Sequence, residues 1–273
     1  MKHLRIWKTS HDSGRTVVFW AATVLTLAFL AGPLLKMALT SRMGGVAAAF
    51  ADRAMLGALV ASLSGATWAT LIGLLVGTPV GFLLARKEFR GKALIEGLID
   101  LPLVVPHPIA GIALLLVFGR RFFVGGALAS AGIQVAGAEA GIVAAMLFVS
   151  VPFLINAARD GFRAVDPRLE NVARTLGHGP WRAFFRVTLP LARPWLVSGA
   201  VMMWARAISE FGAVVVLAYY PMTAPVLIYD RFERFGLEAA KPLATALVAV
   251  ALVVFAGLRY LNARSRRTRP ALP

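Results

Sequence analysis

The stretch AMLGALVASLSGATWATLIGLLVGTPVGFLLA, residues 54 to 85, contains no charged side chain over its whole length. About 20 predominantly apolar residues are enough to cross the hydrocarbon core of a bilayer as a helix, so this run is long enough to span a membrane. Further uncharged runs of comparable character occupy residues 16–35, 140–158 and 242–258. The sequence therefore predicts an all-α protein that crosses the membrane several times.

The composition agrees with this interpretation. Hydrophobic residues make up 59% of the chain, charged residues make up 15%, and the mean hydropathy is +0.74. In an average soluble domain about a quarter of the residues are charged, and a water-soluble fold would have no place to bury this much apolar surface. The chain contains no cysteine, which excludes disulfides and thiolate metal sites.

The spread of positive charge predicts the topology. We place six spans, at about residues 16–39, 56–86, 93–119, 139–158, 190–219 and 239–262. Of the 29 lysines and arginines, 20 fall on one side of these spans, eight fall on the other, and Arg206 alone lies inside a span. Positive charge collects in cytoplasmic loops, so both termini should be cytoplasmic, including a tail at residues 1–15. The expected location is the inner cell membrane.

The third predicted span has an irregular sequence, DLPLVVPHPIAG at residues 100–111. Pro102, Pro106 and Pro108 remove backbone donors and should kink or break the helix near the middle of the membrane. Such a break needs protein or water around it. The segment either lines a pathway or forms a kinked helix inside the bundle, and this feature alone favours neither.

A polar segment, PRLENVARTLGHGPWRAFFRVTLP at residues 167–190, lies between the fourth and fifth predicted spans. Asp166 offers an N-cap oxygen, and Pro167 suits the first position of a helix. One face of this short helix is apolar, because four residues recur at helical spacing: Leu169, Val172, Ala173 and Leu176. Gly177 should end the helix.

A second short helix is expected from Gly179 and Pro180 to Arg186, with Pro190 beginning the next span. The predicted result is a helix-turn-helix on the cytoplasmic face. Its arginines could hold anionic lipid headgroups, or its apolar face could dock a cytoplasmic partner. A DNA-binding role is disfavoured, because short tethers to two spans leave little room to reach a groove. We therefore predict no nucleic-acid partner.

The run ENVARTLGHGPWRAFFRVTLPLARP resembles the EAA loop of permease subunits of ABC importers, in which Glu-Ala-Ala is followed by a glycine and then by Leu-Pro. Asn171 and Val172 depart from the alanines of that pattern. The resemblance implies that residues at about 166–190 form coupling helices, which sit in a groove of an ATP-binding subunit. It assigns this coupling to Glu170, Ala173, Leu176, Gly177 and Pro190.

Two further stretches, ARKEFRGKALIEGLIDLPLVVPHPIAG and ISEFGAVVVLAYYPMTAPVLIYDRF, look like molybdate and tungstate permeases, with sulfate permeases as near relatives. The resemblance implies a permease domain at residues 16–273 that forms a path for tungstate or molybdate, with sulfate, thiosulfate or another anion as the alternative. It also implies a homodimer, two ATP-binding subunits that carry ATP and Mg, an extracytoplasmic oxyanion-binding protein and surrounding membrane lipid.

A membrane-embedded enzyme is the rival class of function. The chain has no Walker motif, no HExxH and no Gly-x-Ser-x-Gly element, so neither ATP binding nor hydrolase chemistry is indicated. The candidate pathway residues are Pro106, His107, Arg206 and Glu210. Arg206 and Glu210 lie four apart, so they can pair on one helix face, either to fix packing or to help a dianion pass. The arginine-rich stretch at residues 259–270 should anchor the last span to lipid headgroups.

Overall fold

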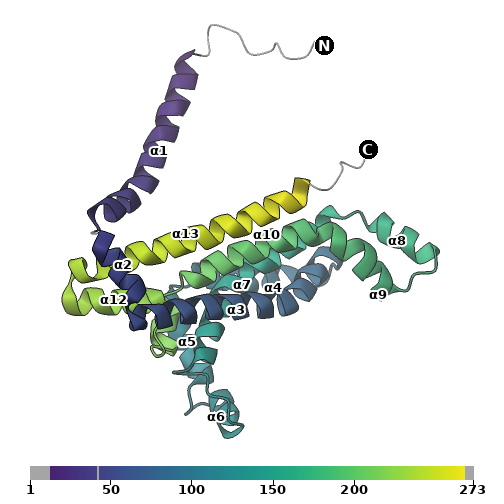
Figure 1. Cartoon of the computed structure of the whole chain (residues 1–273). Helices are drawn as coiled ribbons and strands as arrows, with labels where there is room; N and C mark the ends of the chain where they lie inside the picture. Colours follow the sequence, from purple (N-terminus) through teal and green to yellow (C-terminus); the bar gives the residue numbers. More distant parts are fainter. Residues whose placement is uncertain (1–12, 42, 268–273) are drawn as a thin grey trace.

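The computed structural model describes residues 13–41 and 43–267, and all regular structure in these residues is helical (Figure 1). In chain order the helices are α1 (Ser13–Thr40), α2 (Met43–Ala51), α3 (Arg53–Arg86), α4 (Lys92–Val104), α5 (His107–Phe118), α6 (Phe123–Ser130), α7 (Glu139–Ala164), α8 (Pro167–Thr175), α9 (Pro180–Ala183), the π-helical turn η1 (Phe184–Thr188), α10 (Leu189–Ile208), α11 (Gly212–Leu217), α12 (Ala224–Phe235) and α13 (Leu237–Arg267). Most of the predicted N-terminal tail, and the end of the arginine-rich stretch, lie outside the described residues.

Four helices are long and apolar enough to cross a membrane: α1, α3, α7 and α13. The pair α4 and α5 meets the same standard only when it is taken as one span, bent by 114° at its break. The fifth predicted span, at 190–219, is not one continuous helix, because α10 ends at Ile208 and α11 begins at Gly212. The sequence also left three short helices unpredicted, α2, α6 and α12.

The centre of the bundle is formed by α3, α7 and α10, which pack closely because small residues face their neighbours. A methyl group at Gly199 of α10 would lie 2.6 Å from Cβ of Ala157 and 3.3 Å from Cα of Leu154, both on α7. A methyl group at Gly81 of α3 would lie 2.6 Å from Cβ of Ala158. Small residues let helix backbones approach closely, which is the usual source of helix association in a membrane.

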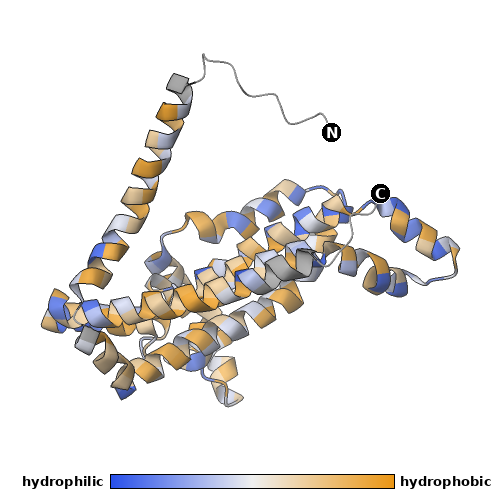
Figure 2. Cartoon of the chain, turned by 45° about the horizontal axis from the view of Figure 1, so that its top comes forward, coloured by the Kyte–Doolittle hydropathy of each residue, from blue (hydrophilic) through white to orange (hydrophobic). Residues whose placement is uncertain are grey.

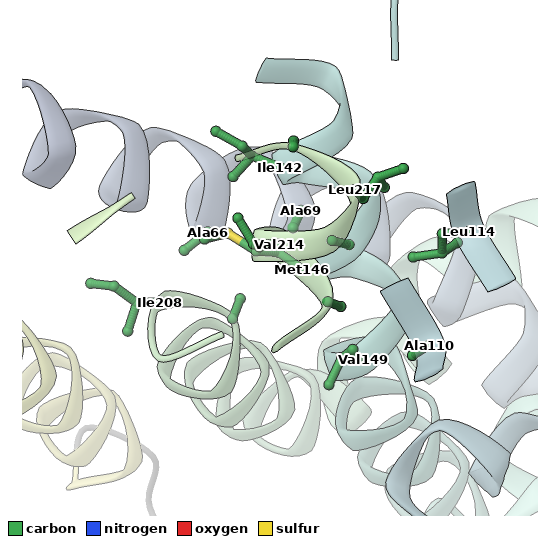
Figure 3. Close-up of a cluster of buried hydrophobic side chains, with 14 of the residues drawn as sticks. Ala66, Ala69, Ala110, Leu114, Ile142, Met146, Val149, Ile208, Val214 and Leu217 are labelled. Carbon is green, nitrogen blue, oxygen red and sulfur yellow. The ribbon is translucent and has the colours of Figure 1, made fainter. Parts of the chain in front are cut away.

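A buried apolar cluster joins the long helices to the two short ones beside them (Figure 3). Ala66 and Met146 lie within it, and Leu114 of α5 and Leu217 of α11 bring in the broken segments. Hydrophobic residues also run along the outside of the long helices (Figure 2). An apolar interior together with an apolar exterior is what a bundle surrounded by lipid requires.

Two elements extend from this centre. Helix α1 leaves the bundle at an angle, and its apolar stretch is fully uncovered (Figure 1). Helix α12 is linked to the preceding segment by Tyr219, whose Oη donates to Asp230 Oδ1 at 2.7 Å. Within α12, Arg234 Nε donates to the same oxygen at 2.9 Å.

The close contact at Gly199 generates a stability prediction. Gly199→Ala should destabilise the protein by about 1–3 kcal/mol, because the added methyl group would push α10 away from α7. Gly57→Ala is the matched control, since Gly57 lies in α3 with nothing within 4 Å of the new methyl group. Alanine there should be neutral or stabilising, because it restricts the unfolded chain. Thermal denaturation of the purified protein in detergent measures both variants, and equal midpoints would contradict the packing.

Candidate functional site

The first component of the candidate site is the break between α4 and α5. Helix α4 runs through Pro102 to Val104, so that proline does not end it. The break falls at Val105 and Pro106, where both residues are extended, and α5 starts at His107. The predicted interruption is therefore confirmed, and the structure places it at the second proline.

The second component is the break between α10 and α11, which the sequence did not reveal. Glu210 occupies this break, and its Oε1 accepts a hydrogen bond from the backbone N–H of Ala213 at 2.8 Å. That contact satisfies one of the amide donors that are left free at the start of a helix. No proline marks the position, and the local sequence offers only Gly212, two residues after Glu210, as a sign of a break.

The two breaks lie against each other. A methyl group at Gly212 would lie 2.8 Å from Cβ of His107, and one at Gly111 would lie 2.8 Å from the carbonyl oxygen of Ala213. The start of α5 is thus in close backbone contact with the start of α11. This packing brings His107, in the third predicted span, next to the charged pair Arg206 and Glu210 in the fifth.

The resulting cluster consists of His107, Arg206 and Glu210. Arg206 Nη2 donates to Glu210 Oε2 at 2.7 Å, which confirms the pairing expected from their spacing. Arg206 Nη2 also contacts His107 Nε2. Because a guanidinium can only donate, this ring nitrogen acts as the acceptor. His107 Nε2 lies 3.7 Å from Glu210 Oε2. The sequence named His107 as a pathway candidate together with the pair, but it did not predict this contact.

Burial divides the three side chains. The Glu210 side chain is 2% exposed, whereas those of Arg206 and His107 are 24% and 36% exposed. The carboxylate is therefore enclosed and fully bonded, while the cationic partner and the imidazole reach a surface. Buried charges inside membrane proteins usually face the bundle interior or an aqueous cavity. A guanidinium in such a position can donate hydrogen bonds to a passing oxyanion.

The second region of interest is the elbow formed by α8 and α9, which projects from one end of the bundle (Figure 1). Asp166 Oδ1 accepts from the N–H of Arg168 at 2.9 Å, so the predicted N-cap is confirmed. The helix ends at Thr175, and two residues later Gly177 turns the chain with a left-handed φ of +86°. The N–H of His178 then donates to the carbonyl of Ala173 at 3.1 Å, which closes the helix end.

The second half of the elbow differs from the prediction. No helix end separates Arg186 from Pro190, because α9, η1 and α10 follow one another without a break from Pro180 to Ile208. Pro190 lies in the first turn of α10 and does not begin a separate helix. Helix α9 is therefore the start of the same helical rod that ends beside Glu210.

The side chains of the elbow also divide into two groups. The side chain of Glu170 lies against η1, where its Oε2 accepts a hydrogen bond from Thr188 Oγ1 at 3.0 Å. The apolar face expected from the sequence, here called the ridge, consists of Leu169, Val172, Ala173 and Leu176. Of these, Ala173 is buried. The remaining ridge residues stay open, with exposed fractions of 47% for Leu169, 56% for Val172 and 76% for Leu176.

Neither region offers metal chemistry. Among residues 13–41 and 43–267, no three histidine or acidic side chains converge on a point that could hold a metal ion. The cluster of His107, Arg206 and Glu210, here called the broken-span cluster, contains a single carboxylate and a single imidazole. What it can do is donate hydrogen bonds and supply positive charge, and the elbow can offer an apolar contact surface.

Comparison with known proteins places these features in context. The family described as "Binding-protein-dependent transport system inner membrane component" matches residues 77–267. The molybdate/tungstate transport system permease protein WtpB of Pyrococcus abyssi is 44% identical over 253 residues, which are 91% of this chain and 96% of the relative. Its counterpart from Thermococcus kodakarensis is 51% identical over 203 residues, covering 74% and 77%. A probable sulfate transport system permease protein, cysT of Chlorokybus atmophyticus, is 35% identical over 207 residues, covering 74% and 72%.

The fold has solved counterparts. A bacterial alginate ABC transporter, in complex with an alginate pentasaccharide-bound periplasmic protein, contains a chain with a TM-score of 0.74 at 16% identity. The match covers 98% of this chain and all of the other. At this identity the likeness concerns the fold alone.

The enclosed carboxylate generates a prediction about the pair. Arg206→Met should cost about 3–5 kcal/mol and reduce the yield of well-folded protein, because it leaves Glu210 buried with its charge uncompensated. Adding Glu210→Gln should recover most of the loss, since glutamine keeps an oxygen for the N–H of Ala213. Size-exclusion chromatography of the detergent-solubilised variants measures this. A single variant as well behaved as the double would show that the pair does not hold the two breaks together.

Proposed function

This chain belongs to the family of inner-membrane components of binding-protein-dependent transport systems, and from that membership we propose that it carries tungstate or molybdate across the membrane. It is a transport component and not an enzyme. The oxyanion is proposed from relatives named as molybdate/tungstate permeases at up to 51% identity. Sulfate or thiosulfate is the second candidate, because a sulfate permease is also similar.

One observation supports the proposed mode of action. Helix α8 projects from the bundle as part of the elbow (Figure 1). Leu169, Val172 and Leu176 are exposed along it. Exposed apolar side chains on a projecting helix need a partner surface. An ATP-binding subunit that receives this ridge could move the elbow, and the unbroken helix from Pro180 to Ile208 would carry the movement to the broken-span cluster.

The remaining partners follow from the same proposal. ATP and Mg would be bound by two cytoplasmic subunits. A second copy of this permease would complete the path, and an extracytoplasmic protein would deliver the anion. One solved transporter of similar fold is in complex with an alginate pentasaccharide-bound periplasmic protein, which supports this part of the proposal. Specificity for one oxyanion would then rest mainly on the delivering protein.

For the topology we propose six crossings, in which α4 with α5 forms the third and α10 with α11 forms the fifth. The other four are the long apolar helices α1, α3, α7 and α13. This arrangement puts 20 of the 29 lysines and arginines on the elbow side. Positive charge favours the cytoplasm, so the elbow and both termini would be cytoplasmic.

We propose that the transported anion passes along the exposed side of the broken-span cluster. Arg206 and His107 reach a surface at the break, while Glu210 holds Arg206 in place from the buried side. Pro106 shapes the break by ending the α4 turn. A dianion that exchanges water for these donors would need only brief contacts, because a transport site has to release as well as bind.

The proposed function is tested by reconstituting the permease with its ATP-binding subunit and binding protein in liposomes. ATP-dependent uptake of radiolabelled molybdate should occur, and tungstate should compete with it. Uptake of sulfate without molybdate would establish the second candidate. If none of the three anions enters when ATP and the binding protein are supplied, the proposal is wrong.

The topology yields its own prediction. Reporter fusions at Arg120 and Phe235 should read as external, and fusions at Lys92 and Gly177 as cytoplasmic, because of the bias in lysine and arginine. An alkaline phosphatase and green fluorescent protein pair reports the two sides. A cytoplasmic reading at Phe235 would overturn the six-span arrangement.

The elbow yields a prediction about coupling. Gly177→Val should place a β-branched residue at φ +86°, which costs about 1 kcal/mol or more and tilts the ridge. Glu170→Arg should remove the hydrogen bond to Thr188. Both variants should insert normally but lose ATP-driven uptake and bind the ATP-binding subunit less well.

Gly179→Val is the matched control, because Gly179 lies in the same loop with an ordinary φ of −64°. No atom lies within 4 Å of a methyl group at Gly177 or at Gly179, so crowding cannot distinguish them. The control should transport normally. Full transport and unchanged complex formation in Gly177→Val would mean that lipid anchoring, and not coupling, is the role of the elbow.

The path yields the last prediction of this group. In the double variant Arg206→Met, Glu210→Gln, assembly should be recovered but oxyanion uptake should stay well below the wild-type rate, because the guanidinium donors are gone. The ratio of uptake to ATP hydrolysis in liposomes measures this. Wild-type uptake by the double variant would confine the pair to a structural role.

A further inference from the structure

A shallow pocket of about 490 Å³ lies in the elbow that projects from the end of the bundle, between α8 and the start of α9 (Figure 1). Its lining residues are Asn171, Arg174, Thr175, His178 and Pro180. Four of these five carry polar side chains, and none of them is acidic. The apolar ridge contributes no residue to the lining, so the pocket is a second surface of the same element.

The pocket and the ridge lie on opposite flanks of α8. Asn171 follows Leu169 by two positions, and Arg174 follows Val172 by two positions. Because an α-helix has 3.6 residues per turn, side chains two positions apart point about 160° away from each other. All four of these side chains are exposed. A partner that receives the ridge therefore approaches from the other side of the helix and leaves the pocket accessible.

The pocket offers hydrogen-bond donors that lack partners. The side chains of Asn171 and Arg174 form no hydrogen bond and no ion pair with any residue in the part of the chain that the structure describes. Thr175 Oγ1 donates to the carbonyl of Val172 at 2.8 Å, so that hydroxyl proton and that carbonyl are already engaged. A free guanidinium and a free amide, with no carboxylate beside them, are complementary to an anion.

The imidazole of His178 supplies a further donor. Its Nδ1 is buried and has no hydrogen-bond partner among the described residues. The residue as a whole is only half-buried, so Nε2 is the ring nitrogen that can reach a ligand. Because no acceptor faces Nδ1, the proton of the neutral ring belongs on Nε2, and this N–H can donate into the pocket.

The charge of the elbow favours the same kind of ligand. Residues 166–188 contain four arginines and two acidic residues. Both carboxylates are engaged within the chain, since Asp166 Oδ1 accepts from the N–H of Arg168 and Glu170 Oε2 accepts from Thr188 Oγ1. The elbow therefore keeps a net positive charge around the pocket, which attracts anions.

We propose that the elbow pocket binds a tetrahedral oxyanion, with Arg174, Asn171 and His178 Nε2 as its donors. The planar guanidinium can donate to two oxygens of such an anion, while the amide and the imidazole reach the others. The ligand is either a free anion, such as phosphate or tungstate, or the phosphate of a lipid headgroup, and the recognition chemistry is the same. The site is separate from the broken-span cluster, because the two lie at opposite ends of the continuous helix from Pro180 to Ile208.

The ligand would join the two arms of the elbow. Asn171 and Arg174 belong to α8, His178 precedes α9, and the left-handed Gly177 lies between them. An anion bonded on both sides of this turn would fix the angle between the arms, and so the direction in which the ridge points. This consequence rests on the proposed coupling role of the elbow, whereas the binding itself does not.

Isothermal titration calorimetry of the full-length permease in a nonionic detergent tests the site, with inorganic phosphate and tungstate as the probes. Arg174→Gln should weaken binding about tenfold or more, the value of one charge-assisted hydrogen bond. Arg168→Gln is the matched control and should bind as the wild type does, because Arg168 is an exposed arginine of the same helix that does not line the pocket. His178→Leu should also weaken binding, whereas His178→Gln keeps a donor near the position of Nε2 and should preserve it.

The source of the anion is decided by repeating the phosphate titration in nanodiscs. Weaker phosphate binding in phosphatidylglycerol than in phosphatidylcholine assigns the site to a lipid headgroup, and equal binding assigns it to a free anion. Equal affinity of the wild type and Arg174→Gln for both probes would overturn the proposal. So would the loss of their difference in the complex with the ADP-loaded ATP-binding subunit, because that subunit would then cover the pocket. None of these measurements requires transport, so a failure of uptake in liposomes leaves this test intact.

Discussion

The structure depends on one constraint, which is that backbone N–H and C=O groups inside a bilayer have to be satisfied by the protein. This chain interrupts two of its proposed spans, and each interruption exposes groups that lipid cannot satisfy. The two breaks meet this requirement by packing against each other. Glu210 accepts from the N–H of Ala213, and the bare backbone at Gly212 lets His107 pack against the second break. Once a carboxylate is buried there, Arg206 is needed to neutralise it.

The continuous helix from the elbow to the break has a mechanical consequence. The helix that begins in the elbow at Pro180 continues through η1 and α10 to the edge of the same break. This route contains a π-helical turn, and π-turns often mark functional positions in helices. Thr188 of that turn donates to Glu170 of α8, so both arms of the elbow are joined at the place where the helix is irregular. A movement imposed on the elbow would reach the broken-span cluster along a continuous element.

The surface of the bundle divides into regions with different neighbours. The interior is closed by glycine and alanine contacts among α3, α7 and α10, which leave no room for added atoms. The outer faces of α1 and α13 remain apolar and uncovered, as lipid or another membrane subunit requires. The elbow ridge is also uncovered and belongs to a strongly polar helix, a combination that fits the proposed docking to an ATP-binding subunit.

Uncharged length and local turn chemistry were enough to predict the four long apolar helices, the break near Pro106, the N-cap Asp166 and the turn at Gly177, because each depends on a few neighbouring residues. The Arg206 and Glu210 pair was also predictable, since four residues make one helical turn. The break at Ser209–Phe211, the inward turn of Ala173 and the approach of His107 to Arg206 were not. Each of these is decided by contacts between residues far apart in the chain, such as Gly212 against His107 and Thr188 against Glu170. Local pattern determines where a helix can form, and only tertiary packing decides which side chains meet across two helices.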